Sequence, residues 1–201
     1  MVSGELHMKR EIVRADILSM DDYLKIRKER RAEIVALKKN RRLEVGPFAT
    51  FYFEAWDTMW LQVQEMLYIE KGGEAQIQGE LDAYNPLIPR GEELVATVMF
   101  EIDDPLRRAR VLARLGGVEK TAFIEVAGER VAGIPEADQD RTNAEGKASS
   151  VQFLRFPFAQ IQIARFREAG ARVIVGFAHP EYGHLAVMPE PVRQALAGDF
   201  A

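Results

Sequence analysis

Two histidines flank a turn near the C-terminal end of the chain, in the sequence His179-Pro180-Glu181-Tyr182-Gly183-His184. Alternating apolar residues on either side predict two strands, 172–179 and 184–188, joined by a four-residue loop. Facing residues of such a hairpin have Cβ atoms about 5 Å apart. His179 and His184 at that distance could bind one metal ion with help from Glu181, or titrate as a coupled pair. The alternative is a pair of structural histidines at a turn.

The absence of cysteine limits the chemistry of any metal site. It excludes a disulfide framework, a thiolate nucleophile, an iron–sulfur cluster held by the chain's own thiolates and a zinc site with cysteine ligands. Any metal must therefore bind to His, Asp or Glu. A divalent metal ion at the histidine turn is the one cofactor that we consider.

A second set of polar residues follows helical spacing between Phe48 and Lys71, a stretch without Pro or Gly. Each residue of an α-helix advances by about 100°, which places Glu54, Thr58, Gln62 and Glu65 on one stripe beside an apolar face. Glu65 lies at the border of that face. A carboxylate there must be paired, ligate a metal or shift its pKa, unless the border meets water.

Basic residues share the apolar face of the preceding predicted helix, from about Met20 to Arg41. We predict that Arg27 or Arg30 forms a bidentate ion pair with Glu54 or Glu65 of the neighbouring helix. Such a pair is more often structural than catalytic, and arginine stems can also extend past a core to water without any function. The candidate polar cluster of the sequence is Arg27, Arg30, Glu54, Thr58, Gln62 and Glu65.

Several classes of function lack their motifs. The segments 146–149 and 116–121 do not complete a Walker A phosphate loop, and neither a serine-nucleophile elbow nor a Rossmann glycine triplet occurs. The aromatic residues between Phe48 and Trp60 fit a helix core better than a base-stacking surface. We therefore expect neither an NTPase nor a nucleic-acid partner.

The predicted elements divide into a helical and a strand-rich part. Helices are predicted at about 20–41, 48–71 and 74–84, and further helices at 104–115, 159–169 and 190–197. Strands are predicted at about 93–102, 121–126, 129–134, 150–157, 172–179 and 184–188, and a polar loop at 138–147. This order indicates an α+β fold, with an N-terminal helical half packed on a mainly antiparallel β-sheet half. We expect one domain over 1–201, with a helical sub-region 1–90 and a β-rich sub-region 91–201.

The charge of the chain is unevenly distributed. Its 201 residues carry a formal net charge of −4, whereas Lys25 to Arg42 holds nine Lys and Arg against Glu29 and Glu33, which leaves about −11 for the remainder. A basic helix on an acidic body could guide a homo-oligomer or an acidic partner, or be an ordinary solvated helix face. Because neither a signal-peptide core nor an apolar stretch of about 20 residues is present, we expect a cytoplasmic protein and no membrane partner.

Short segments spread over nearly the whole chain carry a family resemblance. They are Gly46-Pro47, Thr50-Phe51, Phe53-Glu54, Thr58, Gln62-Val63-Gln64-Glu65-Met66, Glu80-Leu81, Ala83-Tyr84-Asn85-Pro86-Leu87, Arg141 and Ser149-Ser150-Val151-Gln152-Phe153-Leu154-Arg155-Phe156. In this order they resemble the bacterial domain-of-unknown-function family 3501. The resemblance implies one compact domain and no established activity. It also implies a setting beside rubrerythrin-like and iron–sulfur proteins, and so a partner of that kind.

Two functional hypotheses follow. The first is a non-catalytic accessory protein of redox or oxidative-stress physiology, which binds its partner through the basic first helix or a sheet edge. The second is an enzyme, or a small-ligand or metal-binding protein, with Glu65, Arg27, His179 and His184 in a cleft between the helices and the sheet. An enclosed pocket onto which these side chains converge would favour the second, and mutual pairing of the side chains would favour the first.

Overall fold

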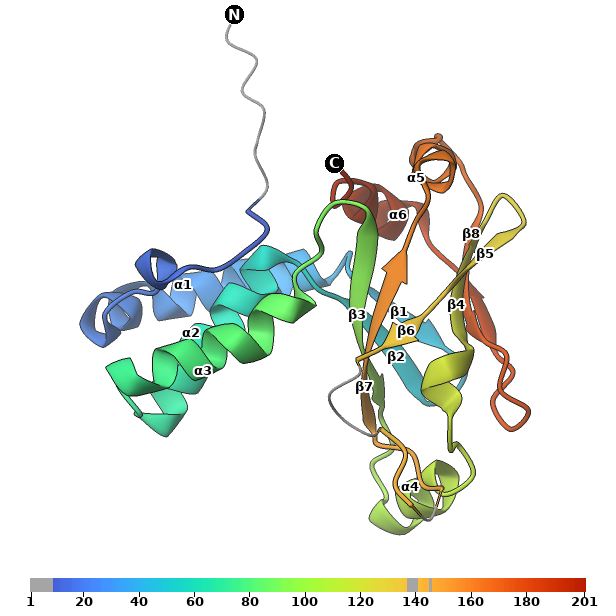
Figure 1. Ribbon diagram of the computed structural model, residues 1–201, viewed down its shortest axis with the longest axis horizontal. Helices are drawn as coiled ribbons and strands as arrows, with labels where there is room; N and C mark the ends of the chain where they lie inside the picture. Colours follow the sequence, from blue (N-terminus) through green and yellow to red (C-terminus); the bar gives the residue numbers. More distant parts are fainter. Residues whose placement is uncertain (1–8, 137–140, 145) are drawn as a thin grey trace, which may run out of the picture.

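The computed structural model describes residues 9–136, 141–144 and 146–201 (Figure 1). The chain has the α+β fold that the sequence predicts, with helices first and mostly strands afterwards. Its helices are α1 (Met20–Lys38), α2 (Trp56–Glu70), α3 (Glu74–Tyr84), α4 (Pro105–Leu112), α5 (Gln160–Arg167) and α6 (Glu190–Ala197), with short 3-10 turns η1 (Arg14–Asp16), η2 (Asn85–Leu87) and η3 (Val118–Thr121). The strands are β1 (Arg42–Val45), β2 (Ala49–Phe53), β3 (Glu93–Phe100), β4 (Ala122–Val126), β5 (Glu129–Ala132), β6 (Ile134–Pro135), β7 (Val151–Pro157), β8 (Val173–Phe177) and β9 (Leu185–Val187).

The strands form two antiparallel sheets. The first sheet has the order β1-β2-β3-β7-β6 and the second the order β5-β4-β8-β9. Buried apolar side chains from both sheets form one continuous core, which includes Phe51, Phe156 and Phe177. The ring of Phe51 contacts both of the other rings, with centroid distances of 6.4 Å to Phe156 and 5.2 Å to Phe177. The two sheets therefore pack face to face.

The first three helices form a layer beside the first sheet, and Figure 1 shows them extending away from the strands. Strand β3 explains the contact, because its residues alternate between the two faces of the sheet. Leu94 and Ala96 belong to the core between the sheets, whereas Val95 belongs to a second core with Trp60 and Leu81 of the helices. The first sheet is thus covered on both faces.

The segment before α1 holds this layer together. The side-chain amide of Asn85 bonds both backbone groups of Ile12, at 2.8 and 2.9 Å. The indole nitrogens of Trp56 and Trp60 donate to the carbonyls of Glu11 and Asp16. These bonds satisfy backbone groups that would otherwise lack partners outside regular structure.

One predicted helix is partly wrong. The prediction for 48–71 overlooked the β1–β2 hairpin, and α2 begins only at Trp56. Residues 50–53 are β-branched or aromatic, and β2 pairs with β1 and β3 on its two sides, so sheet formation outweighs the helical pattern there. The turn between β1 and β2 needs Gly46, which has a φ of +70°. The helical sub-region 1–90 therefore supplies two strands of the first sheet.

The strand predicted at 129–134 is in fact two strands, β5 in the second sheet and β6 in the first, and the other predicted helices and strands lie within a few residues of their observed bounds. The helix predicted at 74–84 is α3, and the strand predicted at 150–157 is β7. Residues 138–140 and 145 of the predicted loop 138–147 lie outside the described residues, and in the rest of the loop Thr142 forms an isolated β-bridge with Ala148, just after it. Among the helices of the described residues, none combines the length and the apolar character that crossing a membrane requires.

Candidate functional site

The first predicted contact between α1 and α2 is present. Arg27 forms a bidentate ion pair with Glu65, with Nε–Oε1 and Nη2–Oε2 distances of 2.7 and 2.8 Å. The hydroxyl of the buried Tyr23 donates to the same carboxylate. The bonds from Arg27 lower the pKa of Glu65, whereas burial, with the acceptor Glu65, raises the pKa of Tyr23. The prediction that Arg27 or Arg30 pairs with Glu54 or Glu65 is confirmed, and the pair joins two helices.

The other members of the predicted polar cluster lie elsewhere. Arg30 pairs with Glu33 of its own helix at 2.8 Å, and its guanidinium lies over the ring of Trp60 at 5.0 Å. The amide of Gln62 is 3.4 Å from the hydroxyl of Tyr84. The predicted stripe is wrong at its first residue, because Glu54 precedes α2. The six residues therefore do not converge on one site.

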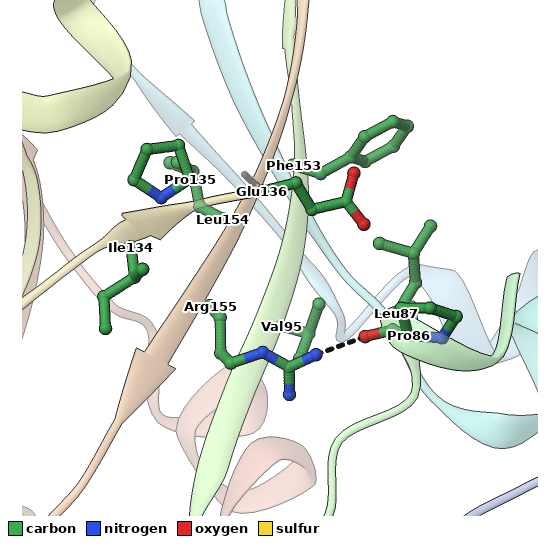
Figure 2. Close-up of a pocket in the computed structure, with 9 residues that line it drawn as sticks. All are labelled: Pro86, Leu87, Val95, Ile134, Pro135, Glu136, Phe153, Leu154 and Arg155. Carbon is green, nitrogen blue, oxygen red and sulfur yellow. Dashed lines mark hydrogen bonds between the residues drawn. The ribbon is translucent and has the colours of Figure 1, made fainter. Parts of the chain in front are cut away.

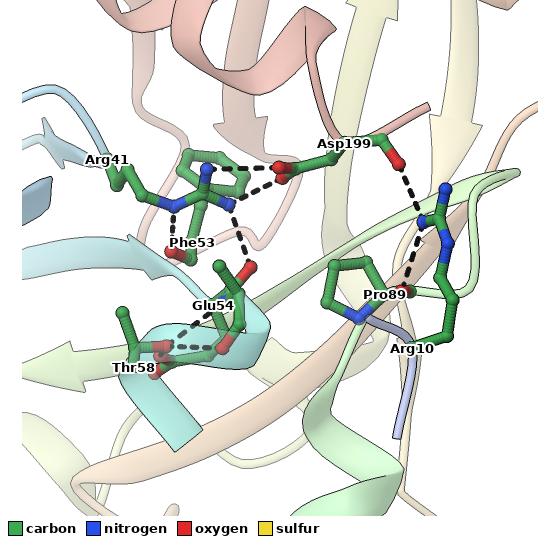
Figure 3. A network of polar contacts seen from close by, with 8 residues as sticks. Arg10, Arg41, Phe53, Glu54, Thr58, Pro89 and Asp199 are labelled. Carbon is green, nitrogen blue, oxygen red and sulfur yellow. Dashed lines mark hydrogen bonds and ion pairs between the residues drawn. The ribbon is translucent and has the colours of Figure 1, made fainter. Parts of the chain in front are cut away.

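Glu54 lies in a buried network at the junction of the helices and the sheets (Figure 3). Its carboxylate accepts hydrogen bonds from the hydroxyl groups of Thr58 and Thr97, at 2.6 and 2.7 Å. Its backbone carbonyl accepts a bond of 2.8 Å from Arg41. The side chain is almost fully buried, and these two donors compensate for the water that it loses.

Arg41 and Asp199 form the centre of this network. The guanidinium and the carboxylate pair through two bonds of 3.0 and 2.5 Å, and each side chain is 4% exposed. The Nε of Arg41 donates to the carbonyl of Phe53, so the arginine also closes the end of β2. Nothing in the sequence predicts this role of Asp199, because a partner 158 residues away leaves no local pattern.

Arg10 extends the network to the N-terminal segment. Its Nη1 donates to the backbone carbonyl of Asp199 at 2.8 Å and to that of Pro89 at 3.3 Å. Burial raises the pKa of the Asp199 carboxyl despite the opposing attraction of Arg41 and Arg10. A hollow of about 220 Å³ lies alongside, lined in part by Arg10, Trp56 and Asp199. Because the charged groups already bind one another, the network has a structural role: it joins the N-terminal segment to the C-terminal end of the chain.

The histidine turn has a different register from the predicted one. His179 bridges to Tyr182, and the carbonyl of His184 accepts a bond of 3.0 Å from the backbone of Phe177. The predicted facing pair of His179 and His184 is therefore wrong. The ring of His184 instead lies 4.6 Å from that of Tyr182 and fills the space above Gly46, where a Cβ would be 2.6 Å from the imidazole.

The polar groups of this turn have other partners. The Nε2 of His179 is 3.2 Å from the carbonyl of Gly116, and its Nδ1 accepts a bond from the backbone of Glu181. The carboxylate of Glu181 pairs with Arg114. Within residues 9–136, 141–144 and 146–201, no group of three or more His, Asp or Glu side chains could hold a metal ion. The structure thus gives no support to a metal site at His179, Glu181 and His184.

Tyr182 has a structural role that was not predicted from the sequence. Its buried hydroxyl accepts bonds from the backbone nitrogens of Phe48 and Ala49 and donates to the carbonyl of Val45, each at 2.9 Å. Burial raises the pKa of this phenol. The side chain therefore joins the turn after β8 to the turn between β1 and β2, and the histidines belong to this structural corner.

A second hollow, of about 240 Å³, lies between η2 and the strands β6 and β7 (Figure 2). Its lining is mostly apolar, with two charged residues: Pro86, Leu87, Val95, Ile134, Pro135, Glu136, Phe153, Leu154 and Arg155. Arg155 bonds to Glu93 and to the carbonyl of Pro86. No residue of the predicted cluster lines this hollow.

One face of α1 is exposed. We define the outward face of α1 as Leu24, Lys28, Arg31 and Val35 with Lys39, the residue that follows the helix; at these spacings they share one side, and all are exposed. Leu24 and Val35 are 49% and 63% exposed. Arg31 approaches Glu65 at 3.8 Å, and within the described part of the chain neither Lys28 nor Lys39 has an ion pair.

Comparisons with known proteins give a consistent result. A family model described as "Protein of unknown function (DUF3501)" matches residues 11–200. A crystal structure of a novel protein of unknown function from Burkholderia pseudomallei K96243 is 37% identical, with a TM-score of 0.87, and the match covers 94% of this chain and 99% of that chain. A search of curated proteins gives no match.

Proposed function

The chain belongs to the family of proteins of unknown function DUF3501, and from this premise we propose that it is a non-catalytic, partner-binding protein that docks an acidic protein on the outward face of α1. The observation that carries the proposal is a contrast in pairing. Arg27 and Glu65, two of the candidate catalytic groups, are bonded to each other, whereas Lys28 and Lys39 on the outward face of α1 have no ion pair among the described residues.

The pairing argues against a catalytic cleft. Arg27 and Glu65 satisfy each other between two helices, and both ring nitrogens of His179 have backbone partners. The hydrogen-bond partners of the helical pair and of the histidine turn do not overlap. An enzyme site needs groups that are held near one another and remain available to a substrate.

The outward face of α1 has the composition of a docking surface. Leu24 and Val35 lie among Lys28, Arg31 and Lys39, so apolar groups that a partner can bury are surrounded by positive charge. Basic residues steer an acidic partner and fix its orientation, while buried apolar side chains supply most of the affinity. The remainder of the chain is acidic, which disfavours non-specific binding of other acidic proteins elsewhere on the surface.

The redox setting of the partner rests on the family resemblance. We propose a rubrerythrin-like or iron–sulfur protein, since a chain without cysteine serves such a pathway through contact with an electron carrier. The partner's acidic surface determines where it binds on this chain. Its redox group determines which protein it is, and the two properties can be tested separately.

A photo-crosslinking amino acid at Val35 tests the location in native cells. The matched control is Ile161 on α5, which is 61% exposed against 63% for Val35. We expect a discrete crosslinked protein from position 35 and none from position 161. Equal products at both positions, or none at position 35, would overturn the proposal.

Charge reversal tests the mechanism. The triple variant Lys28→Glu/Arg31→Glu/Lys39→Glu should lose the crosslink at position 35, because opposite potentials no longer meet. The control reverses Arg110, Lys120 and Arg172, which are exposed elsewhere on the chain, and should retain the crosslink. Mass spectrometry of the crosslinked protein then tests the redox identity, which a partner without a metal or redox group would contradict.

A further inference from the structure

The hollow in Figure 2 is an unassigned cavity on the outer face of the first sheet. Its volume of about 240 Å³ is below the range of about 300–1,000 Å³ that holds drug-sized ligands. One wall is η2, at the end of the helical layer, and the other consists of β6 and Glu136. The space therefore suits one small molecule.

The body of such a molecule must be apolar. Leu87 and Val95 are almost fully buried at the base of the hollow, and Phe153 is half-buried beside them. Ile134 and Pro135 of β6 complete the wall. Apolar atoms placed here leave water and contact carbon on several sides, which is favourable in proportion to the area covered.

Two opposite charges border this apolar base. Figure 2 shows the carboxylate of Glu136 and the guanidinium of Arg155 reaching toward η2 on different sides of Val95. Arg155 is held by Glu93 and by the carbonyl of Pro86, so its position is fixed before any ligand binds. Within the described residues its Nε has no partner, and a guanidinium can donate five hydrogen bonds.

Glu136 is also able to accept a further bond. Among the described residues it has one ion pair, with Arg141 at 3.5 Å, which is long for a charge-assisted hydrogen bond. Arg141 lies over the ring of Phe153 at 4.6 Å and is mostly buried. The carboxylate therefore keeps an oxygen for a cation, while the aromatic base stays covered on the side of Arg141.

We propose that this hollow binds a small zwitterion, a free α-amino acid with an apolar side chain. The carboxylate of the ligand bonds to Arg155, its ammonium group bonds to Glu136, and its side chain lies on Leu87, Val95 and Phe153. A ligand with one charge would bond to only one of these two residues, whereas a zwitterion bonds to both. The inference stands on this hollow alone and does not depend on α1.

Calorimetric titration with L-leucine tests the proposal, because leucine carries both charges and a branched apolar side chain. The two analogues are 4-methylpentanoate, which lacks the ammonium group, and 3-methylbutylamine, which lacks the carboxylate. We expect saturable binding of leucine in the millimolar range or tighter, and binding of each analogue weaker by roughly tenfold or more. Absence of leucine binding, or equal binding of the analogues, would overturn it.

Variants place the binding in this hollow. Glu136→Gln should weaken leucine roughly tenfold and leave the affinity for 4-methylpentanoate unchanged, since that analogue has no ammonium group. Ile134→Trp adds bulk at the exposed wall and should abolish binding, whereas Ile161→Trp on α5, at a similar exposure, should not. Leucine binding that is identical in Ile134→Trp and the parent protein would contradict the proposed location.

Discussion

Two arginine–carboxylate pairs hold different regions of the molecule, and they differ in burial and in sequence separation. Arg27 and Glu65 join two neighbouring helices, are 38 residues apart and are 25% and 16% exposed. Arg41 and Asp199 join the start of the first sheet to the C-terminal end, are 158 residues apart and are each 4% exposed. The first pair fixes a contact within one layer, and the second fixes how the ends of the chain meet.

The difference matters because burial changes what a broken pair costs. A charge at a helix border recovers water when its partner is removed, so the loss is moderate. A charge in the interior does not, and removal of its partner costs about 3–5 kcal/mol. Substitution of the Arg41–Asp199 pair should therefore lower the free energy of unfolding more than substitution of the Arg27–Glu65 pair, although both pairs have bidentate geometry.

The largest expected effect is that of Arg41→Met. It leaves the carboxylate of Asp199 buried without its cation and removes the donors to the carbonyls of Phe53 and Glu54. We expect the free energy of unfolding in urea to fall by about 3–5 kcal/mol. If the free energy of unfolding fell by no more than it does for a surface ion pair, the Arg41–Asp199 pair would be no more important for stability than the Arg27–Glu65 pair.

The adjacent residue supplies the control for this measurement. Arg42 pairs with Glu44 at 2.9 Å, and their side chains are 51% and 67% exposed. Arg42→Met should change the free energy of unfolding by about 0–1 kcal/mol, as is usual for surface pairs. The same substitution at two neighbouring arginines then compares a buried, multiply bonded side chain with an exposed one.

Lowering the pH should have a smaller effect on the free energy of unfolding, and the contributions of Glu65 and Asp199 should change in opposite directions. Arg27 lowers the folded-state pKa of Glu65, so the stability that this carboxylate contributes is complete above about pH 5 and is lost as the pH falls below its unfolded value of about 4.3. The advantage of the parent protein over Glu65→Gln should therefore shrink between about pH 5 and pH 3.

Asp199 should respond in the other direction. Because burial raises its folded-state pKa, the folded protein takes up the proton more readily than the unfolded chain, and this term grows as the pH falls toward about 4. Relative to Asp199→Asn, which does not titrate, the parent protein should gain stability over that interval. Urea melts at several pH values measure both differences, and slopes of equal sign would contradict the distinction between the two pairs.

The sequence predicts the elements and local contacts of this fold better than its distant contacts. Arg27–Glu65 could be predicted because helical periodicity places both side chains at the interface of consecutive helices. The register at His179 could not, since a turn of different length shifts which residues face each other. The residues around Phe51 form β2 instead of the predicted helix because β2 pairs with β1 and β3, and these pairing partners are present only in the folded sheet.

The network of Arg10, Arg41 and Asp199 is harder to predict from the sequence than these elements are. Neither Asp199 nor Arg10 belongs to a periodic pattern, and their contacts depend on the whole fold bringing the two ends together. The hollow in Figure 2 is of the same kind, since η2, β3, β6 and β7 each contribute to its lining. Local patterns specify elements, whereas sites at element junctions arise from packing.

The smallest expected effect sharpens the comparison from the helical side, at Gln64. The side chains of Arg41, Asp199 and Glu54 are bonded, yet Gln64 on α2 is fully buried and neither polar atom of its amide has a partner among the described residues. A buried amide without partners loses its bonds to water. Methionine has a similar unbranched shape and adapts to irregular space, so Gln64→Met should raise the free energy of unfolding by about 1 kcal/mol.

The control is Gln62→Met, at the half-buried contact with Tyr84, which should change the free energy of unfolding little. A clear loss of stability in Gln64→Met would mean that the amide is bonded in solution, and the helical layer would then resemble the junction in satisfying its buried polar groups.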